Sequence, residues 1–171
     1  MRPPESCSPP SVLPYTDTKP QGAADFFFAI NATFRFVISK FGTEGWGEYL
    51  RDMAREYYRP VWHAWKAGGL DAVARYLVQS FEAEPDAVFA VRREKESVVL
   101  DVVECPAIKH LRKDGRIIVP EFCQHCYFQY SEMARLAGFH MRLEGGNGAC
   151  RQTFSSEALP PQDMKLIADA K

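Results

Sequence analysis

The spacing of apolar residues changes near Pro85, from a helical period to a strand period. Before it, apolar residues recur at steps of three and four, beginning with the stretch 26–41, as they do along one face of a helix. After it, the apolar runs 87–91 and 97–103 flank the charged segment 92–96, which predicts a β-hairpin. A chain with helices first and strands afterwards is expected to fold as an α+β protein.

Glycine and proline divide the N-terminal half into predicted helices. The first helix ends at Gly42, and a second runs over 43–57, up to the break imposed by Pro60. Pro60 then opens a short helix, which the pair Gly68–Gly69 interrupts, and a further amphipathic helix follows over 70–81. The first half of the domain is therefore expected to be helical.

The C-terminal half predicts a helix between two hairpins. Pro120 is expected to start a helix, which continues over residues 121–137. The segments 140–143 and 150–154 alternate as strands around the glycine-rich turn 145–148. The expected fold is thus a helical N-terminal half packed on a four-stranded, mostly antiparallel sheet, formed by two hairpins that a helix joins.

Composition sets the predicted domain limits. The chain has 171 residues, of which 46% are hydrophobic, enough for a single core. Residues 1–22 hold six of the twelve prolines and are expected to form a flexible arm. One α+β domain is predicted over 23–155, followed by a C-terminal tail, 156–171, that docks either on this domain or on a partner.

Charge and the first residues bear on partners and localisation. The formal net charge is −1, without long blocks of one sign, which argues against binding to nucleic acid or to an anionic membrane. Met1–Pro10 contains no apolar run, so a secretory signal or membrane span is not expected there. We expect a cytoplasmic protein with free thiols and a small-molecule substrate, and the sequence leaves a homo-oligomer open.

Three cysteines lie at positions where chemistry is common. Cys105 follows a predicted strand and precedes Pro106, although a thiol there also suits the core. Cys123 and Cys126 are three residues apart at the start of the predicted helix 121–137, where the helix dipole favours thiolate. Such a pair fits a redox centre, half of a zinc site or two packed core thiols.

Histidines and carboxylates supply further candidates. His110, His125 and His140 are candidate general bases because imidazole titrates near neutral pH. The spacing of Asp101 and Glu104 places them on opposite faces of a regular strand, so they are not expected to act as a carboxylate pair.

The chain resembles a known family in three short motifs. These are Glu104-Cys105-Pro106 after a hairpin, the helix that carries Cys123 and Cys126, and the last strand with its entry, 146–154. Together they resemble the L-2-amino-thiazoline-4-carboxylic acid hydrolase family, whose sheet region is similar to 4-vinyl reductase domains. The resemblance covers roughly residues 25 to 155.

The resemblance implies hydrolytic opening of a thiazoline ring to N-carbamoyl-cysteine, without a cofactor. Residue chemistry then suggests roles for particular side chains. Cys105 is a candidate nucleophile, His125 a candidate general base and Glu104 an orienting or protonating group. Arg142 or Arg151 would hold the substrate carboxylate.

A second interpretation makes the protein a small-ligand-binding or metal-binding sensor without catalysis. Its zinc ion or iron–sulfur cluster would be held by Cys105, Cys123, Cys126 and Cys150. A third interpretation is that these cysteines only pack in the core.

Overall fold

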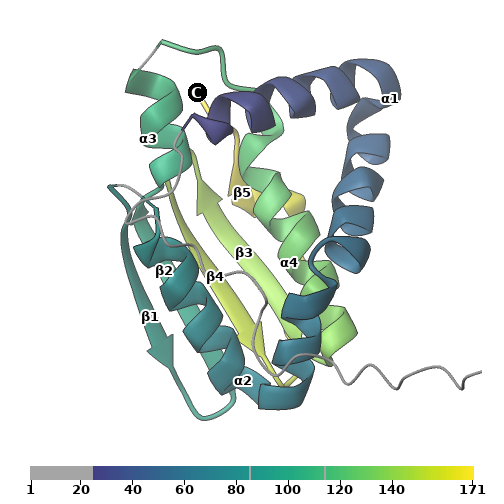
Figure 1. Ribbon diagram of the computed structural model, residues 1–171, viewed down its shortest axis with the longest axis vertical. Coiled ribbons are helices and arrows are strands. Elements are labelled where there is room, and N and C mark those ends of the chain that lie inside the picture. The colour runs from purple at the N-terminus through teal and green to yellow at the C-terminus, as the bar shows by residue number, and fades with distance from the viewer. Residues whose placement is uncertain (1–24, 85, 114) are drawn as a thin grey trace, which may run out of the picture.

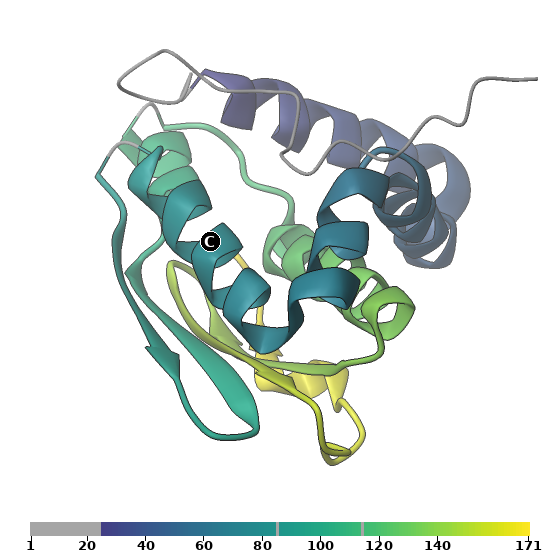
Figure 2. The ribbon, with the colours of Figure 1, turned by 60° about the horizontal axis from the view of Figure 1, so that its bottom comes forward.

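The computed structural model describes residues 25–84, 86–113 and 115–171 and arranges them in two layers, with the helices over one face of a sheet (Figures 1 and 2). The elements are α1 (Phe26–Glu56), α2 (Arg59–Glu82), β1 (Val88–Arg93), β2 (Ser97–Glu104), α3 (Pro106–Lys113), the single turn η1 (Pro120–Cys123), α4 (Gln124–Ala137), β3 (His140–Gly146), β4 (Ala149–Ser155), the single turn η2 (Met164–Leu166) and β5 (Ile167–Ala168). The predicted arm 1–22 lies outside the described residues.

The α+β class is confirmed, with both predicted hairpins in one sheet. The sheet has five strands rather than four, in the order β1-β2-β4-β3-β5. Neighbours are antiparallel except β3 and β5, which run parallel. The fifth strand is only two residues long, too short for an alternating pattern to reveal it.

Glycines bend the two long helices where the sequence predicts breaks. The backbone leaves helical geometry at Gly42, with φ of 70°, and at Gly69, with φ of 66°. Glycine reaches this region readily because it has no Cβ. The α1 helix therefore consists of two arms at an angle (Figure 1), and its second arm ends shortly before Pro60, which lies in the first turn of α2.

The core consists of two clusters of buried side chains. One joins α2 and α4 to the sheet and includes Trp65, Leu100 and Phe154. The other joins α1 to α3 and η1 and includes Phe34 and Trp46. Cys105 and Cys123 pack against both clusters, so these two thiols lie where the clusters meet.

The predicted tail 156–171 docks on the domain. Ile167 and Ala170 are buried, and the Ala170 amide donates to the Pro120 carbonyl at 2.8 Å. A Cβ on Gly146 would lie 2.5 Å from the Ala168 carbonyl oxygen, so glycine at this position lets β5 approach β3.

Among the described residues, none of the helices has the length and apolar character needed to cross a membrane.

Candidate functional site

Four cysteines gather where β2 ends, β4 begins and α4 starts. Cys105, Cys123, Cys126 and Cys150 are free thiols, and each is close enough to the others for their charges to interact. Burial is the main cause of the raised pKa of every one of them, and it raises the pKa of Cys105 and Cys126 to about 12. The resting cluster is therefore protonated near neutral pH.

Cys105 stands between β2 and the first turn of α3. Burial raises its pKa most, but the backbone N–H groups of Ile108 and Ala107 face its sulfur and act in the opposite direction. Its own amide donates to the Gly148 carbonyl at 2.8 Å. A thiolate formed at Cys105 would thus meet hydrogen-bond donors and the positive end of a helix.

Cys123 faces the turn between β3 and β4. The Asn147 amide donates to the Cys123 sulfur at 3.2 Å, and the Gly148 amide and the Arg112 guanidinium also lower its pKa, against a larger effect of burial. Asn147 has a positive φ of 55° between two glycines that also have positive φ. The predicted hairpin turn is confirmed, and its backbone amides point toward a thiol.

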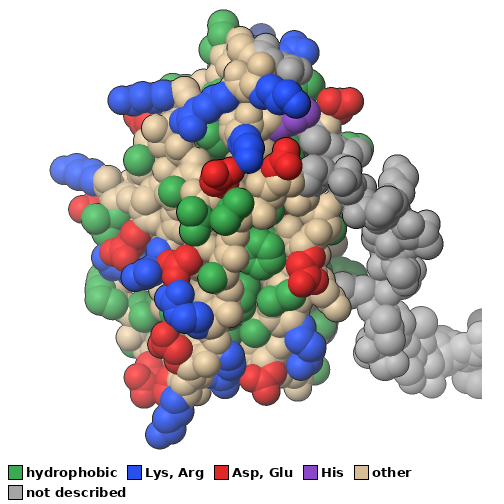
Figure 3. All heavy atoms as spheres, turned by 90° about the vertical axis from the view of Figure 1, so that its left-hand side faces the viewer, with side chains coloured by type: hydrophobic (Ala, Val, Ile, Leu, Met, Phe, Trp, Pro, Cys, Tyr) green, Lys and Arg blue, Asp and Glu red, His purple; other side chains and the backbone are tan. Residues whose placement is uncertain are grey.

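A cavity of about 390 Å³ opens beside Cys105, between the end of β2, α3 and the start of β4. Two cations from α3 line it. Lys109 pairs with Glu104 at 2.6 Å, and Arg112 donates to the main-chain oxygens of Asn147 at 3.0 Å and Lys171 at 2.9 Å. Basic side chains gather at this end of the molecule, with acidic ones beside them (Figure 3). Because Glu104 offsets Lys109, the charged residues of the lining leave one net positive charge, from Arg112, which can attract a small anion.

The structure brings together two of the three predicted catalytic residues. Glu104 and Cys105 line the same cavity, whereas His125 lines a different one, between α1 and α4. The His125 Nδ1 donates to the Phe122 carbonyl, and its Nε2 lies 3.4 Å from the Cys126 sulfur. Burial lowers the pKa of His125, so the ring is neutral near neutral pH.

The predicted carboxylate-binding arginines lie on the opposite face of the sheet. Pairing of β2, β3 and β4 places Cys150 toward the helices, and alternate residues of a strand face opposite ways. Arg151 accordingly pairs with Asp101 at 2.6 Å, and Arg142 pairs with Glu144 at 2.9 Å. Neither arginine lines the cavity beside Cys105.

Lys109 and Arg112 of α3, rather than those arginines, line the cavity beside Cys105, and neither these residues nor α3 was predicted from the sequence. A signal was present. Pro106 can open a helix, and the apolar residues that α3 buries behind it include Ala107, Ile108 and Leu111, at helical spacing. The basic residues between them fall on the other side of this short helix.

The remaining candidates lie apart from the cavity beside Cys105. His110 contacts the Phe28 ring at 4.8 Å and Asp25 at 3.5 Å. His140 is exposed at the start of β3. Asp101 binds Arg92 and Arg151 on the helix-free face, so the expectation that Asp101 and Glu104 do not form a carboxylate pair agrees with their positions.

The four cysteines of the metal interpretation lie close together, but their thiols do not point toward a common centre. In residues 25–84, 86–113 and 115–171, no group of three or more His, Cys, Asp or Glu side chains is arranged to hold an ion. The thiols would have to turn toward a common point to form a tetrahedral site.

Fold and site together define an α+β protein with a thiol and two cations around a small cavity. Comparisons of the chain with protein-family models, with curated proteins and with solved structures found no match.

Proposed function

We propose that the protein hydrolyses a small anionic cyclic C–N substrate of the 2-amino-thiazoline-4-carboxylate type to N-carbamoyl-cysteine, with Cys105 as nucleophile. The supporting observation is the cavity in which Cys105, Glu104, Lys109 and Arg112 meet. The motifs that resemble the thiazoline hydrolases supply the substrate class.

Cations on α3 provide the substrate carboxylate with a binding position. Arg112 donates to the two amide oxygens of Asn147 and to the main-chain oxygen of Lys171, and its hydrogen bonds to a substrate carboxylate would be stronger than those to the neutral oxygens of Asn147. Lys109 adds positive charge from the next turn of α3. Both lie on the same side of the sheet as the thiols, unlike Arg142 and Arg151.

The raised pKa of Cys105 suits a first step in which its thiol acts as both acid and nucleophile. The thiol proton passes to the ring nitrogen while the sulfur adds to the carbon of the C=N bond. The ring C–S bond then breaks with its electron pair on the substrate sulfur. This leaves a positively charged isothiouronium group, whose carbon is bonded to the Cys105 sulfur.

In the second step of the proposed reaction, Glu104 activates water. Its carboxylate lines the cavity beside Cys105 and takes one proton from the attacking water, which it passes to the substrate thiolate. The carbon–sulfur bond to the enzyme breaks as the urea carbonyl forms. The departing Cys105 sulfur faces the amides of Ala107 and Ile108 and recovers its proton from the new hydroxyl group.

Turnover of 2-amino-thiazoline-4-carboxylate tests this proposal, with N-carbamoyl-cysteine measured by mass spectrometry and its new thiol by a colorimetric reagent. Wild type is expected to form product, and Cys105→Ser to lose at least about a thousandfold in kcat. Arg112→Gln is expected to raise KM. Arg151→Gln, altered on the other face of the sheet, is the matched control and should retain activity. Undiminished turnover by Cys105→Ser would reject the mechanism.

A sensor function remains the second candidate, because four thiols in one cluster are an unusual set for packing alone. Elemental analysis of protein purified without a metal-binding tag separates the two. Stoichiometric zinc or iron, with loss of folding after chelation, would favour the sensor. Turnover by metal-free protein would favour the hydrolase.

A further inference from the structure

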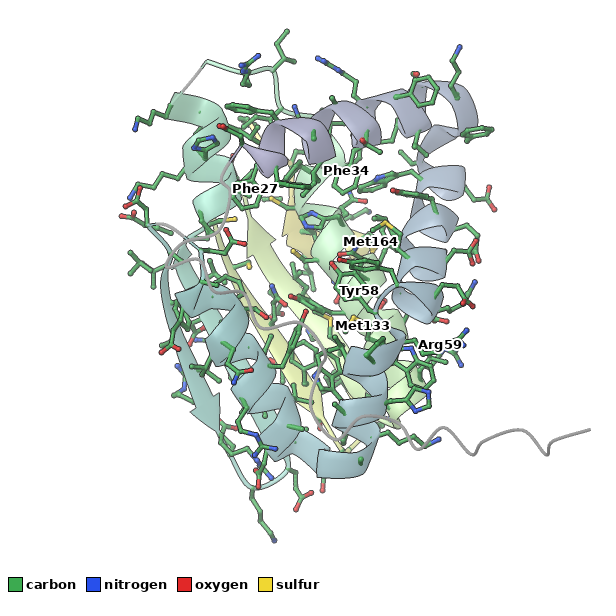
Figure 4. All side chains as sticks on the ribbon, viewed as in Figure 1. Phe27, Phe34, Tyr58, Arg59, Met133 and Met164 are labelled. Carbon is green, nitrogen blue, oxygen red and sulfur yellow. The ribbon has the colours of Figure 1, made fainter. Side chains whose placement is uncertain are left out.

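A second cavity, of about 280 Å³, lies between α1 and α4. The bend at Gly42 allows both arms of α1 to line it, with Ile30 and Phe34 from the first arm and Tyr49 and Met53 from the second. Phe34 and Tyr58 point inward toward α4 (Figure 4), and His125 faces them from α4. This cavity shares no lining residue with the one beside Cys105.

The lining is aromatic and uncharged. Apart from His125, its residues are apolar or carry hydroxyl or amide groups. His125 is neutral because burial lowers its pKa, and Tyr58 keeps its proton because burial raises its pKa. A formal charge entering this space would lose hydration without gaining an opposite charge, which is costly.

Aromatic rings set the shape of the space. The Phe34 ring lies 5.3 Å from the His125 ring and packs edge-on against Trp46 at 5.3 Å, so its position is fixed from behind. An apolar protein cavity of roughly 150 Å³ accommodates benzene, so this larger cavity has room for a ring with a substituent. The hydroxyls of Tyr49 and Tyr58 and the amide of Gln129 offer hydrogen bonds to that substituent.

We propose that this cavity binds a small uncharged aromatic molecule, as a site separate from the cavity beside Cys105. The ring packs between Phe34 and Tyr58, and a neutral hydroxyl or amide of the ligand meets the polar groups of the wall. The site discriminates by charge in the opposite sense to the proposed substrate cavity, which selects anions.

Isothermal titration calorimetry near neutral pH tests the proposal. The three ligands are p-cresol, which is neutral, benzoate, which is an anion, and benzylammonium, which is a cation, and they are similar in size. We expect p-cresol to bind with a dissociation constant of about 1 mM or lower. Both ions are expected to bind at least about tenfold more weakly. Equal binding of benzoate, or no binding of p-cresol at about 10 mM, would overturn the proposal.

Two matched variants locate the binding. Ala29 lines the cavity and Ala32 does not, and both are exposed residues of α1. Ala29→Phe is expected to fill the space and abolish p-cresol binding, whereas Ala32→Phe leaves it unchanged. Thermal unfolding verifies that both variants fold, and Thr33→Phe on the same wall replaces Ala29→Phe if that variant does not. Unchanged binding by a folded filling variant refutes the site. Thiazoline turnover is measured separately, so the two proposals fail independently.

Discussion

Cys123 differs from the other three described cysteines in what surrounds its sulfur. The Cys123 sulfur accepts a hydrogen bond from the Asn147 backbone amide at 3.2 Å and lies near the Arg112 guanidinium. Burial raises the pKa of all four thiols, to about 12 for Cys105 and Cys126, but among them only Cys123 has a nearby cation that lowers its pKa. Cys123 is therefore expected to ionise first in the resting protein. Cys105 does not need prior ionisation in the proposed reaction, because the substrate nitrogen accepts its proton.

Alkylation kinetics can measure this order. With iodoacetamide near pH 8, we expect Cys123 to be modified fastest of the four, since the thiolate is the reactive form. Arg112→Gln removes a positive charge that lowers the pKa of Cys123 and is expected to slow its alkylation by about two- to tenfold. The measurement is the rate of labelling of each peptide by mass spectrometry.

Arg151→Gln serves as the control, because Arg151 lies on the other face of the sheet with Asp101. It should leave the rate at Cys123 unchanged. Faster labelling of Cys126 than of Cys123 would contradict the assigned surroundings of the two thiols.

Among the elements, α1 and α4 are joined by a buried carboxylate. Glu132 of α4 binds Arg55 of α1 at 2.8 Å and Arg135 of its own helix at 2.7 Å. Hydrogen bonds from Arg135 and then Arg55 lower the pKa of Glu132 to about 2, although burial acts in the opposite direction. Removal of this charge leaves the guanidinium of Arg55 without its most buried partner.

Glu132→Gln is accordingly expected to lower the free energy of unfolding by about 1–3 kcal/mol at neutral pH. The native pKa lies below the unfolded value of about 4.3, so the stabilisation is present above that pH and disappears as pH falls toward about 2. Urea unfolding at neutral and acidic pH measures it. Glu56→Gln, in an exposed pair with Arg59, should change stability by less than about 0.5 kcal/mol. A Glu132→Gln effect independent of pH would refute this account.

The sequence predicts an element well only where the element leaves a clear local pattern of residues. Gly42 and Gly69 were located because a residue without Cβ marks a break in a periodic helix. The α3 helix was missed because it has only eight residues, barely two turns of periodicity. The side of the sheet on which Arg151 lies follows from strand pairing, which a single sequence leaves open.

Only the part of the candidate site that follows from local sequence was predicted. Cys105 and Glu104 were found because they follow an evident strand. The gathering of Cys150 with Cys105 depends on β2 pairing with β4, a contact between segments that lie about 50 residues apart. His125 was predicted as a general base from the chemistry of imidazole alone, which does not show the direction of a helical side chain, and in the structure His125 lines the other cavity.

For the molecule as a whole, the thiols connect the two core clusters. Cys105 and Cys123 contact both, and Cys126 and Cys150 pack against the cluster over the sheet. Ionisation of a thiol here would place a charge in the interior of the protein. The folded state therefore holds these protons more strongly than the unfolded chain does.

Alkaline pH should consequently destabilise the folded protein. An unfolded thiol loses its proton above about pH 8.5, whereas folded Cys105 and Cys126 retain theirs up to a pKa of about 12. Since the folded pKa is raised, the stabilisation is complete below the unfolded pKa and declines as pH rises. At about pH 10, each of these thiols lowers the free energy of unfolding by roughly 2 kcal/mol relative to neutral pH.

Urea unfolding between neutral pH and about pH 10 measures this decline, and Cys126→Ala isolates the contribution of one thiol. Loss of the sulfur shifts stability at every pH through packing, but the decline with pH should be smaller by roughly 2 kcal/mol because one titrating group is gone. Ser131→Ala, a substitution of similar size in α4, should leave the pH dependence unchanged. If Cys126→Ala and wild type decline in parallel, Cys126 is not held protonated by burial, and its place in the cluster must be revised.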